Sequence, residues 1–180
     1  MNIIFQVIYF LIPGAFANMA PVLVKKWFKK LEYPIDCNKK IFGERILGDH
    51  KTFRGLIFGI LAAIFGVFLQ VLLYNFSFFK DLSVINYPTV NIVLLGFLIG
   101  FGILLGDAIG SFFKRRFKIR PGKEFMPVDQ LDSPIVMFLI LLPFGYFDFR
   151  FVLIGVIFWG IGHILINYIG WYFKIKKNKF

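Results

Sequence analysis

Five stretches of this 180-residue chain contain no Asp, Glu, Lys or Arg, and they constrain the fold more than any other feature. They are Met1–Val24, Gly55–Phe79, Leu82–Gly106, Ser133–Phe147 and Phe151–Phe173. A helix needs about 20 residues to cross a hydrocarbon core of about 30 Å, and four of the stretches are that long. The fourth stretch has 15 residues and contains Pro143 and Gly145, so its length alone also allows a re-entrant segment.

The composition supports a membrane protein. With 58% hydrophobic and 17% charged residues, the chain carries more apolar surface than a soluble domain of this size can bury. Disordered, coiled-coil and collagen-like chains are excluded, and the single cysteine, Cys37, excludes a disulfide scaffold. The first stretch lacks a basic segment before it and is followed by lysines, so we interpret it as an anchor and not a cleavable signal. The sequence predicts an all-α, polytopic integral membrane protein.

Positive charges separate the connections into two kinds. Nineteen of the 21 Lys and Arg residues lie in 25–54, 114–123 and the tail 174–179, whereas Lys80 and Arg150 lie alone in the other two connections. If all five stretches span, the nineteen share one side, which the positive-inside tendency identifies as cytoplasmic. The expected spans are about 3–24, 55–79, 90–113, 133–149 and 151–173. We therefore expect five transmembrane helices with cytoplasmic connecting loops in one membrane-embedded domain, 1–180, with its N-terminus outside and its C-terminus inside.

The net charge of +11 fits this topology and an attraction to anionic lipid headgroups. No nucleic-acid-binding motif accompanies the basic residues, so the bilayer is an expected partner and nucleic acid is not. The two cytoplasmic connections are long for turns and rich in polar residues. We expect the chemistry of the protein to lie there.

Asp107 is a carboxylate near the end of the third stretch, where an unpaired charge in the membrane is costly. Helical spacing places it on one face with Ser111, Lys114 and Arg115. An ion pair with a nearby Lys or Arg is the structural alternative, but the pattern favours a functional carboxylate. Glycines recur through the same stretch and predict close helix packing. They are Gly96, Gly100, Gly102, Gly106 and Gly110.

Asp129 and Asp132 stand three residues apart at the entrance to the fourth stretch, so one helical turn points both carboxylates the same way. Two like charges so placed repel each other unless a cation lies between them. Oxygen ligands of this kind suit Mg²⁺, which is usually shared with substrate phosphates. The structural alternative is a pair of helix N-terminal acids stabilised by the helix dipole. With Asp107 at the same membrane face, we predict a site for Mg²⁺ and phosphate.

The first cytoplasmic connection places Lys51, Thr52 and Arg54 among glycines, where backbone N–H groups and cations could together bind phosphate. Lys51 follows Gly48 by three residues instead of one, so this segment is not a P-loop. His50 is uninformative by itself.

Polar residues also interrupt the first and fifth stretches. Asn18 lies between Pro13 and Pro21, where a broken helix would expose backbone to a ligand. His163 and Asn167 are one helical turn apart, and we expect both to form interhelical hydrogen bonds.

Four motifs in order resemble those of the CDP-archaeol synthase family, the archaeal relatives of CDP-diacylglycerol synthases. They are Phe16–Pro21, Gly48–Gly55, Gly106–Arg115 and Asp129–Asp132. The resemblance implies that CTP reacts with 2,3-di-O-geranylgeranylglyceryl phosphate to form CDP-archaeol and diphosphate. It favours the archaeal branch because Gln130 replaces an Arg of the broader pattern, and it leaves the role of the segment 32–36 open.

The resemblance implies the following site. Catalytic roles fall to Asp107, Asp129, Asp132 and Lys114, with the three aspartates as Mg²⁺ ligands. Substrate-binding roles fall to Asn18, Lys51, Thr52, Arg54, Ser111, Lys114 and Arg115.

Two other functions stay open on the sequence alone. A CTP-dependent lipid or polyprenol kinase needs similar residues but transfers the γ-phosphoryl group. A small ion-coupled transporter would use the membrane carboxylate as an ion site. The sequence shows no inverted repeat, and its polar residues gather at one membrane face, which favours an enzyme over a transporter.

Overall fold

The computed structural model of the protein describes residues 2–119, 123 and 125–172. Its helices are α1 (Ile3–Leu23), α2 (Phe53–Leu73), α3 (Ser77–Leu82), α4 (Ile92–Arg116), α5 (Val128–Leu141) and α6 (Phe149–Tyr172). Single 3₁₀ turns are η1 (Val24–Lys26), η2 (Lys29–Leu31), η3 (Tyr87–Thr89) and η4 (Leu142–Phe144). A two-residue hairpin, β1 (Lys40–Ile41) and β2 (Glu44–Arg45), pairs Lys40 with Arg45. The basic tail 174–179, used above to assign the topology, lies outside the described residues.

Within residues 2–119, 123 and 125–172, four helices are long and apolar enough to cross a membrane, namely α1, α2, α4 and α6. Helix α5 has 14 residues, which at about 1.5 Å per residue is shorter than the hydrocarbon core. Pro143 lies in η4, where the α-helical hydrogen bonding ends. The all-α, multi-pass part of the expected fold class is therefore confirmed; four of the described helices have spanning length, where five spans were expected.

Helix α4 lies at the centre of the bundle because its glycines let two neighbours approach closely. A Cβ atom added at Gly100 would lie 2.9 Å from the Cα of Ile60 in α2. One added at Gly102 would lie 2.7 Å from the Cα of Met137 in α5. These distances are too short for any side chain, so the close packing predicted from the glycines is confirmed.

Helix α1 continues through Pro13 and Pro21, so the expected break around Asn18 is wrong. Pro13 has no N–H to donate to the carbonyl of Tyr9, one turn earlier. The side-chain Nε2 of Gln70 in α2 donates to that carbonyl instead, at 2.5 Å. A buried side chain of the neighbouring helix thus replaces the backbone hydrogen bond that the proline removes.

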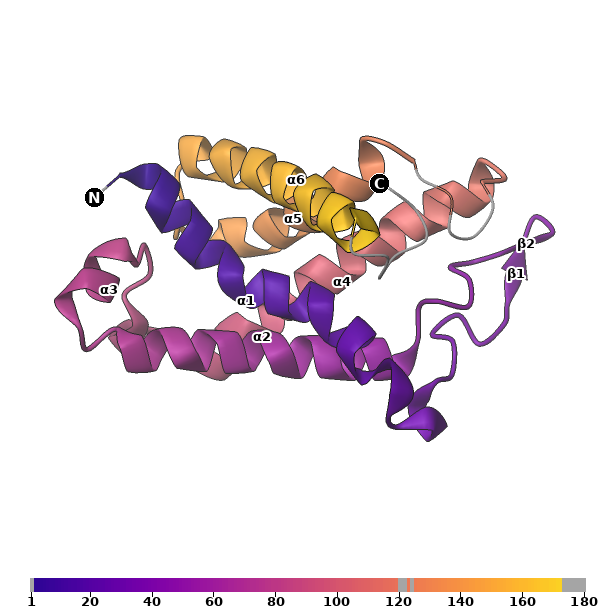
Figure 1. Ribbon diagram of the computed structural model, residues 1–180, viewed down its shortest axis with the longest axis horizontal. Coiled ribbons are helices and arrows are strands. Elements are labelled where there is room, and N and C mark those ends of the chain that lie inside the picture. Colours follow the sequence, from indigo (N-terminus) through magenta and orange to yellow (C-terminus); the bar gives the residue numbers. More distant parts are fainter. Residues whose placement is uncertain (1, 120–122, 124, 173–180) are drawn as a thin grey trace.

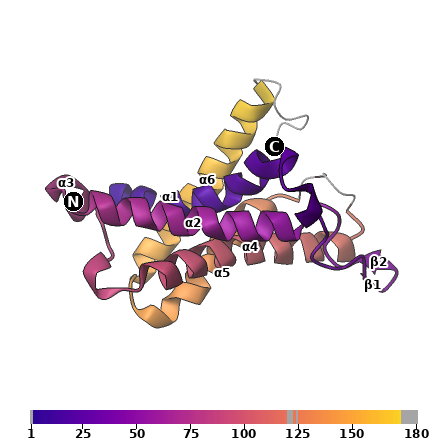
Figure 2. The same cartoon turned by 90° about the horizontal axis from the view of Figure 1, so that it is seen from below.

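The hairpin and α3 lie at opposite ends of the long axis (Figure 1). The end of α1, the start of α2, the end of α4 and the start of α5 lie toward the hairpin. Helix α6 is steeply inclined to α2 when the bundle is seen from below (Figure 2). The polar connections of the sequence therefore gather at one end of the helices, at the hairpin end of the molecule.

Candidate active site

A polar cavity of about 220 Å³ lies at the hairpin end, between the loop before α2 and helices α1, α4, α5 and α6. Its walls are Asn18, Leu47, Gly48, Asp49, His50, Lys51, Asp107, Ser111, Lys114, Arg115, Asp129, Ser133, Trp159 and His163. Seven of the residues singled out from the sequence as site candidates line this one cavity: Asn18, Lys51, Asp107, Ser111, Lys114, Arg115 and Asp129.

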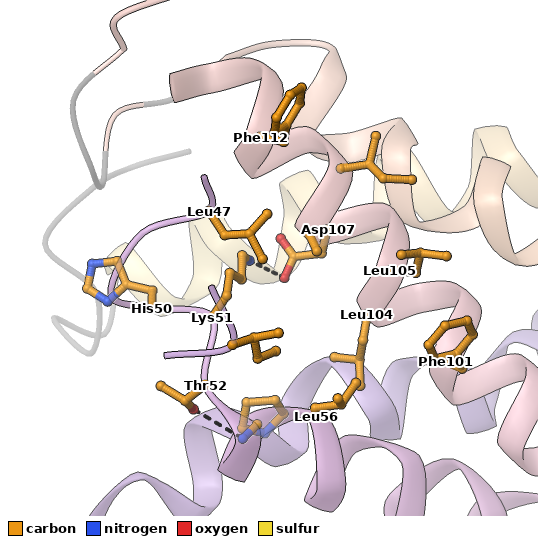
Figure 3. Close-up of a pocket in the computed structure, with 15 residues that line it drawn as sticks. Leu47, His50, Lys51, Thr52, Leu56, Phe101, Leu104, Leu105, Asp107 and Phe112 are labelled. Carbon is orange, nitrogen blue, oxygen red and sulfur yellow. Dashed lines mark hydrogen bonds and ion pairs between the residues drawn. The ribbon is translucent and has the colours of Figure 1, made fainter. Parts of the chain in front are cut away.

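The Nζ of Lys51 forms an ion pair with a carboxylate oxygen of Asp107, and this contact joins the loop to α4 (Figure 3). The lysine side chain is 19% exposed and the aspartate side chain 41%. The ion pair that was the structural alternative for Asp107 is therefore present. Its position on the cavity wall leaves the carboxylate accessible to a ligand.

A second ion pair joins α4 to α5. Lys114 Nζ lies 2.6 Å from Asp129 Oδ2, which also accepts a hydrogen bond from the N–H of Phe125 at 2.9 Å. Asp132 does not line the cavity. It packs against α4 at Gly110, where any Cβ atom would overlap its carboxylate, and it accepts a hydrogen bond from the hydroxyl of Ser133 at 3.1 Å.

Arg115 is a buried cation on the cavity wall, only 8% exposed. Among the described residues no carboxylate or carbonyl accepts a hydrogen bond from its guanidinium, and its Nε is fully buried without a partner. The next residue, Arg116, instead donates to the carbonyls of Ile41 and Arg45 in the hairpin. A buried charge without a partner is costly, so Arg115 is a candidate for binding an anion.

Thr52 and Arg54 do not line the polar cavity. The hydroxyl of Thr52 caps α2 by accepting a hydrogen bond from the N–H of Gly55 at 3.2 Å. Arg54 is 4% exposed and donates to the carbonyl of Trp27 and to Glu32, at 3.1 and 3.0 Å. Thr52 therefore stabilises the start of α2, and Arg54 joins that start to the segment 27–32.

The sequence predicted that backbone N–H groups of the glycine-containing loop could bind phosphate. The N–H groups of Leu47 and Gly48 are instead already used. Both groups donate to the carboxylate of Asp36 at 3.0 Å. Burial would raise the pKa of Asp36, but hydrogen bonds from Arg45 and these backbone groups outweigh it and hold the pKa below its usual range. The N–H groups of Leu47 and Gly48 are therefore not available to a phosphate.

Two apolar grooves adjoin the polar cavity. One, of about 380 Å³, lies between α2 and α4 beneath the loop and shares Lys51 and Asp107 with the cavity (Figure 3). The other, of about 480 Å³, lies between α1 and α6 and shares Asn18, Trp159 and His163 with it. A charged cavity that opens onto apolar grooves suits an amphipathic substrate with an anionic headgroup.

Trp159 and His163 also line the cavity, although Trp159 was not expected there and His163 was expected only to form interhelical hydrogen bonds. One tryptophan among many aromatic residues carries no signal of its own. His163, a polar residue in an apolar stretch, did carry such a signal.

The carboxylates fit a hydrated divalent cation better than a protein-enclosed one. Within the described ranges no group of three His, Cys, Asp or Glu side chains gathers as a metal site. Asp107 and Asp129 nevertheless line the same cavity. Mg²⁺ commonly takes one or two carboxylates together with substrate phosphates and water, so this donor set is compatible with Mg²⁺.

Comparison with protein families matches residues 1–180 to CDP-archaeol synthase. The chain is 34% identical to the CDP-archaeol synthase of Methanocaldococcus jannaschii over 97% of its length and 96% of the relative's. It is likewise 34% identical to that of Archaeoglobus fulgidus over 98% of each chain.

A solved structure of an intramembrane enzyme for archaeal membrane lipids biosynthesis is also similar. It has a TM-score of 0.71 and 26% identity, over 89% of this chain and 91% of the other. Matches over the full length favour the synthase over the kinase and transporter alternatives. The motifs, the polar cavity and these relatives agree, and the chain belongs to the CDP-archaeol synthase family.

Proposed function

We propose that the polar cavity binds the triphosphate of CTP beside the phosphate of an isoprenoid glycerol-ether lipid and transfers the cytidylyl group between them. Members of this family are CTP-dependent cytidylyltransferases of archaeal membrane lipid biosynthesis, and the products are CDP-archaeol and diphosphate. The observation that carries this assignment is Arg115, buried on the cavity wall with no anionic partner among the described residues. A triphosphate supplies the missing negative charge.

Lys51 and Lys114 would bind phosphate oxygens while keeping their ion pairs with Asp107 and Asp129. An ammonium group has three N–H donors, and each lysine uses one on its carboxylate. The ion pair therefore orients the side chain while the remaining donors face the ligand. Ser111 and Asn18 add neutral donors on the same cavity wall.

Asp107 and Asp129 would hold Mg²⁺ at the triphosphate, with Asp132 one helical turn after Asp129. When bound, Mg²⁺ would neutralise charge on the triphosphate and on the departing diphosphate. The lysines that now pair with Asp107 and Asp129 orient both carboxylates at the cavity.

In the reaction, an oxygen of the lipid phosphate forms a bond to the α-phosphorus of CTP. The bond from that phosphorus to the α,β-bridging oxygen breaks, and its electron pair leaves with diphosphate. No covalent enzyme intermediate is required, so this chain contributes positioning and charge neutralisation. Thr52 and Arg54 contact neither substrate in this proposal; they stabilise the start of α2. All of 1–180 would form one catalytic, membrane-embedded domain.

The position of phosphorus attack tests this function directly. Membranes containing the protein are incubated with the lipid phosphate and with CTP labelled at the α- or the γ-phosphorus. We expect the α-label in the organic phase and the γ-label in released diphosphate. A γ-labelled lipid with the α-label left in CDP would make the protein a kinase.

We propose that the groove between α1 and α6 holds isoprenoid chain, because Asn18 and His163 form its polar end at the cavity. A Cβ atom added at Gly162 meets no atom within 4 Å, so a larger side chain there extends into open groove. Gly162→Leu is expected to raise the KM for the lipid phosphate by about 10-fold and to leave the KM for CTP unchanged.

Ala108→Leu fills the groove between α2 and α4 by a similar volume and is the matched control. If Ala108→Leu raised the KM for the lipid phosphate more than Gly162→Leu does, the isoprenoid chain would be assigned to the groove between α2 and α4 instead.

We further propose that all five sequence stretches span the membrane, with the N-terminus outside and the C-terminus and cavity cytoplasmic. Cys37 is exposed, so it is first replaced by Ser. In that background, Lys80→Cys is expected to react with an impermeant thiol reagent in intact cells, and Lys118→Cys only after permeabilisation. Reaction of both cysteines in intact cells would contradict the five-span topology.

A further inference from the structure

Asp36 is a buried carboxylate in the segment 32–36, whose role the sequence left open. Its side chain is 0% exposed, although it lies in a connection that is otherwise largely exposed. Five hydrogen bonds converge on its two oxygens. Oδ1 accepts from Arg45 Nη2 at 2.6 Å and from the N–H of Asn38 at 3.1 Å. Oδ2 accepts from Arg45 Nε at 3.2 Å and from the N–H groups of Leu47 and Gly48 at 3.0 Å.

These contacts exclude a direct role in the reaction. Both carboxylate oxygens of Asp36 are occupied, and the side chain does not line the polar cavity. Successive backbone N–H groups, here with Gly48 at a φ of +104°, commonly form a concave site for an anion. In this protein an internal carboxylate fills that site, so the loop is already folded around a negative charge.

Two of the residues that donate to Asp36 form part of the cavity wall. Leu47 and Gly48 line the cavity themselves, and Lys51 follows three residues later. The segment before Asp36 also runs beside Lys51, since the N–H of Ile35 donates to the Lys51 carbonyl at 2.8 Å. The backbone leading to Lys51 is therefore fixed both through Gly48 and through Ile35.

We infer that Asp36, together with Arg45, is a positioning residue for CTP: it shapes the loop 47–51 so that Lys51 faces the cavity. This inference rests on the proposed function, because it requires Lys51 to bind a CTP phosphate. Asp36 lines no part of the cavity, so it acts on CTP through the loop 47–51, whose cation on the cavity wall is Lys51. A residue that orients a metal-binding side chain by a hydrogen bond typically contributes about 10- to 100-fold to affinity or activity, and we expect a similar contribution from Asp36.

A double-mutant cycle tests the inference in purified, full-length protein, with CTP and the lipid phosphate as substrates. Asp36→Asn is expected to raise the KM for CTP about 10- to 100-fold with a smaller change in kcat. In a Lys51→Met background, the same substitution is expected to change the KM by less than about 2-fold, because the residue it positions is gone. A merely structural role would lower kcat with the folded fraction and leave KM unchanged.

Glu32→Gln is the matched control, because it alters another carboxylate–arginine pair of the same loop, with Arg54, which does not hold 47–51. It is expected to leave the KM for CTP unchanged, and a rise like that of Asp36→Asn would overturn the inference. If Asp36→Asn raised the KM for CTP by the same factor with and without Lys51→Met, the positioning role of Asp36 would be overturned and the proposed function would stand. No effect of Lys51→Met would overturn the proposed role of Lys51 as well. If the Asp36→Asn protein does not accumulate, Arg45→Lys replaces it in the double-mutant cycle. Lysine cannot form both of the hydrogen bonds that Arg45 donates to Asp36.

Discussion

Asp107→Asn and Asp129→Asn are each expected to lower the rate of CDP-lipid formation by about 10²- to 10⁴-fold. The amide keeps the size of the side chain but removes the charge that would hold Mg²⁺, a loss of several kcal/mol at about 1.4 kcal/mol per tenfold in rate. Each change also releases a lysine of the cavity wall from its ion pair. Asp132→Asn is expected to have a smaller effect, because Asp132 packs against α4 at Gly110 and does not line the cavity. Chelation of Mg²⁺ should abolish wild-type activity. Initial rates with CTP and the lipid phosphate measure the effect.

The Asp107→Asn variant is expected to stay folded, because the Asp107 side chain is 41% exposed and exposed ion pairs contribute little stability. The thermal unfolding midpoint of each variant checks its fold. Asp148→Asn is the matched control, since it makes the same carboxylate-to-amide change in another connection. Asp148 accepts a hydrogen bond from the N–H of Phe151 at 2.7 Å, and the amide oxygen of Asn can accept it equally well. Near wild-type rates in all three site variants would make these aspartates structural.

Local periodicity explains why much of the cavity could be predicted from the sequence. Asp107, Ser111, Lys114 and Arg115 are separated by whole helical turns, so an uninterrupted α4 places them on one face whatever its neighbours. The glycines of α4 likewise predict close packing without identifying a partner. Both arguments need only the geometry of a single helix.

Contacts between distant segments were beyond that reasoning. Neither the pairing of Arg54 with Glu32 nor the enclosure of Asp36 by the loop 45–48 follows from a periodic pattern. Both depend on how an irregular connection folds back on itself. The sequence indicated basic residues near glycines, and phosphate binding was the natural hypothesis for all of them. Only the folded loop separates Lys51, which reaches the cavity, from Arg54, which does not.

The break expected in α1 failed for a similar reason. Proline removes one backbone hydrogen bond, and a helix breaks when nothing replaces it. Gln70, 57 positions after Pro13, supplies the donor, and no local rule relates the two. Polar residues inside apolar stretches thus have two roles in this chain. Gln70 donates to a carbonyl that a proline leaves without a backbone donor, whereas Asp107 lines a cavity.

Arg115→Met is expected to abolish most CTP binding while leaving the unliganded protein as stable as the wild type or more stable. The two effects have opposite signs because the guanidinium is buried without a counter-ion among the described residues. Replacing a buried charge by an apolar side chain of similar volume is often neutral or stabilising. Removing it from a bound triphosphate costs about 2 kcal/mol or more, so the Kd for CTP is expected to rise at least about 30-fold.

Thermal unfolding with and without CTP and Mg²⁺ measures both quantities in one experiment, since a ligand that binds only the folded state raises the unfolding midpoint. We expect Arg115→Met to unfold at or above the wild-type temperature without CTP and to show almost no upward shift with it. Arg116→Met is the neighbouring control. Because Arg116 holds the hairpin through the carbonyls of Ile41 and Arg45, its loss should lower the midpoint and preserve the shift with CTP. A destabilised Arg115→Met protein that still responds to CTP would show that Arg115 supports the fold, and the anion site would then have to be placed elsewhere in the cavity.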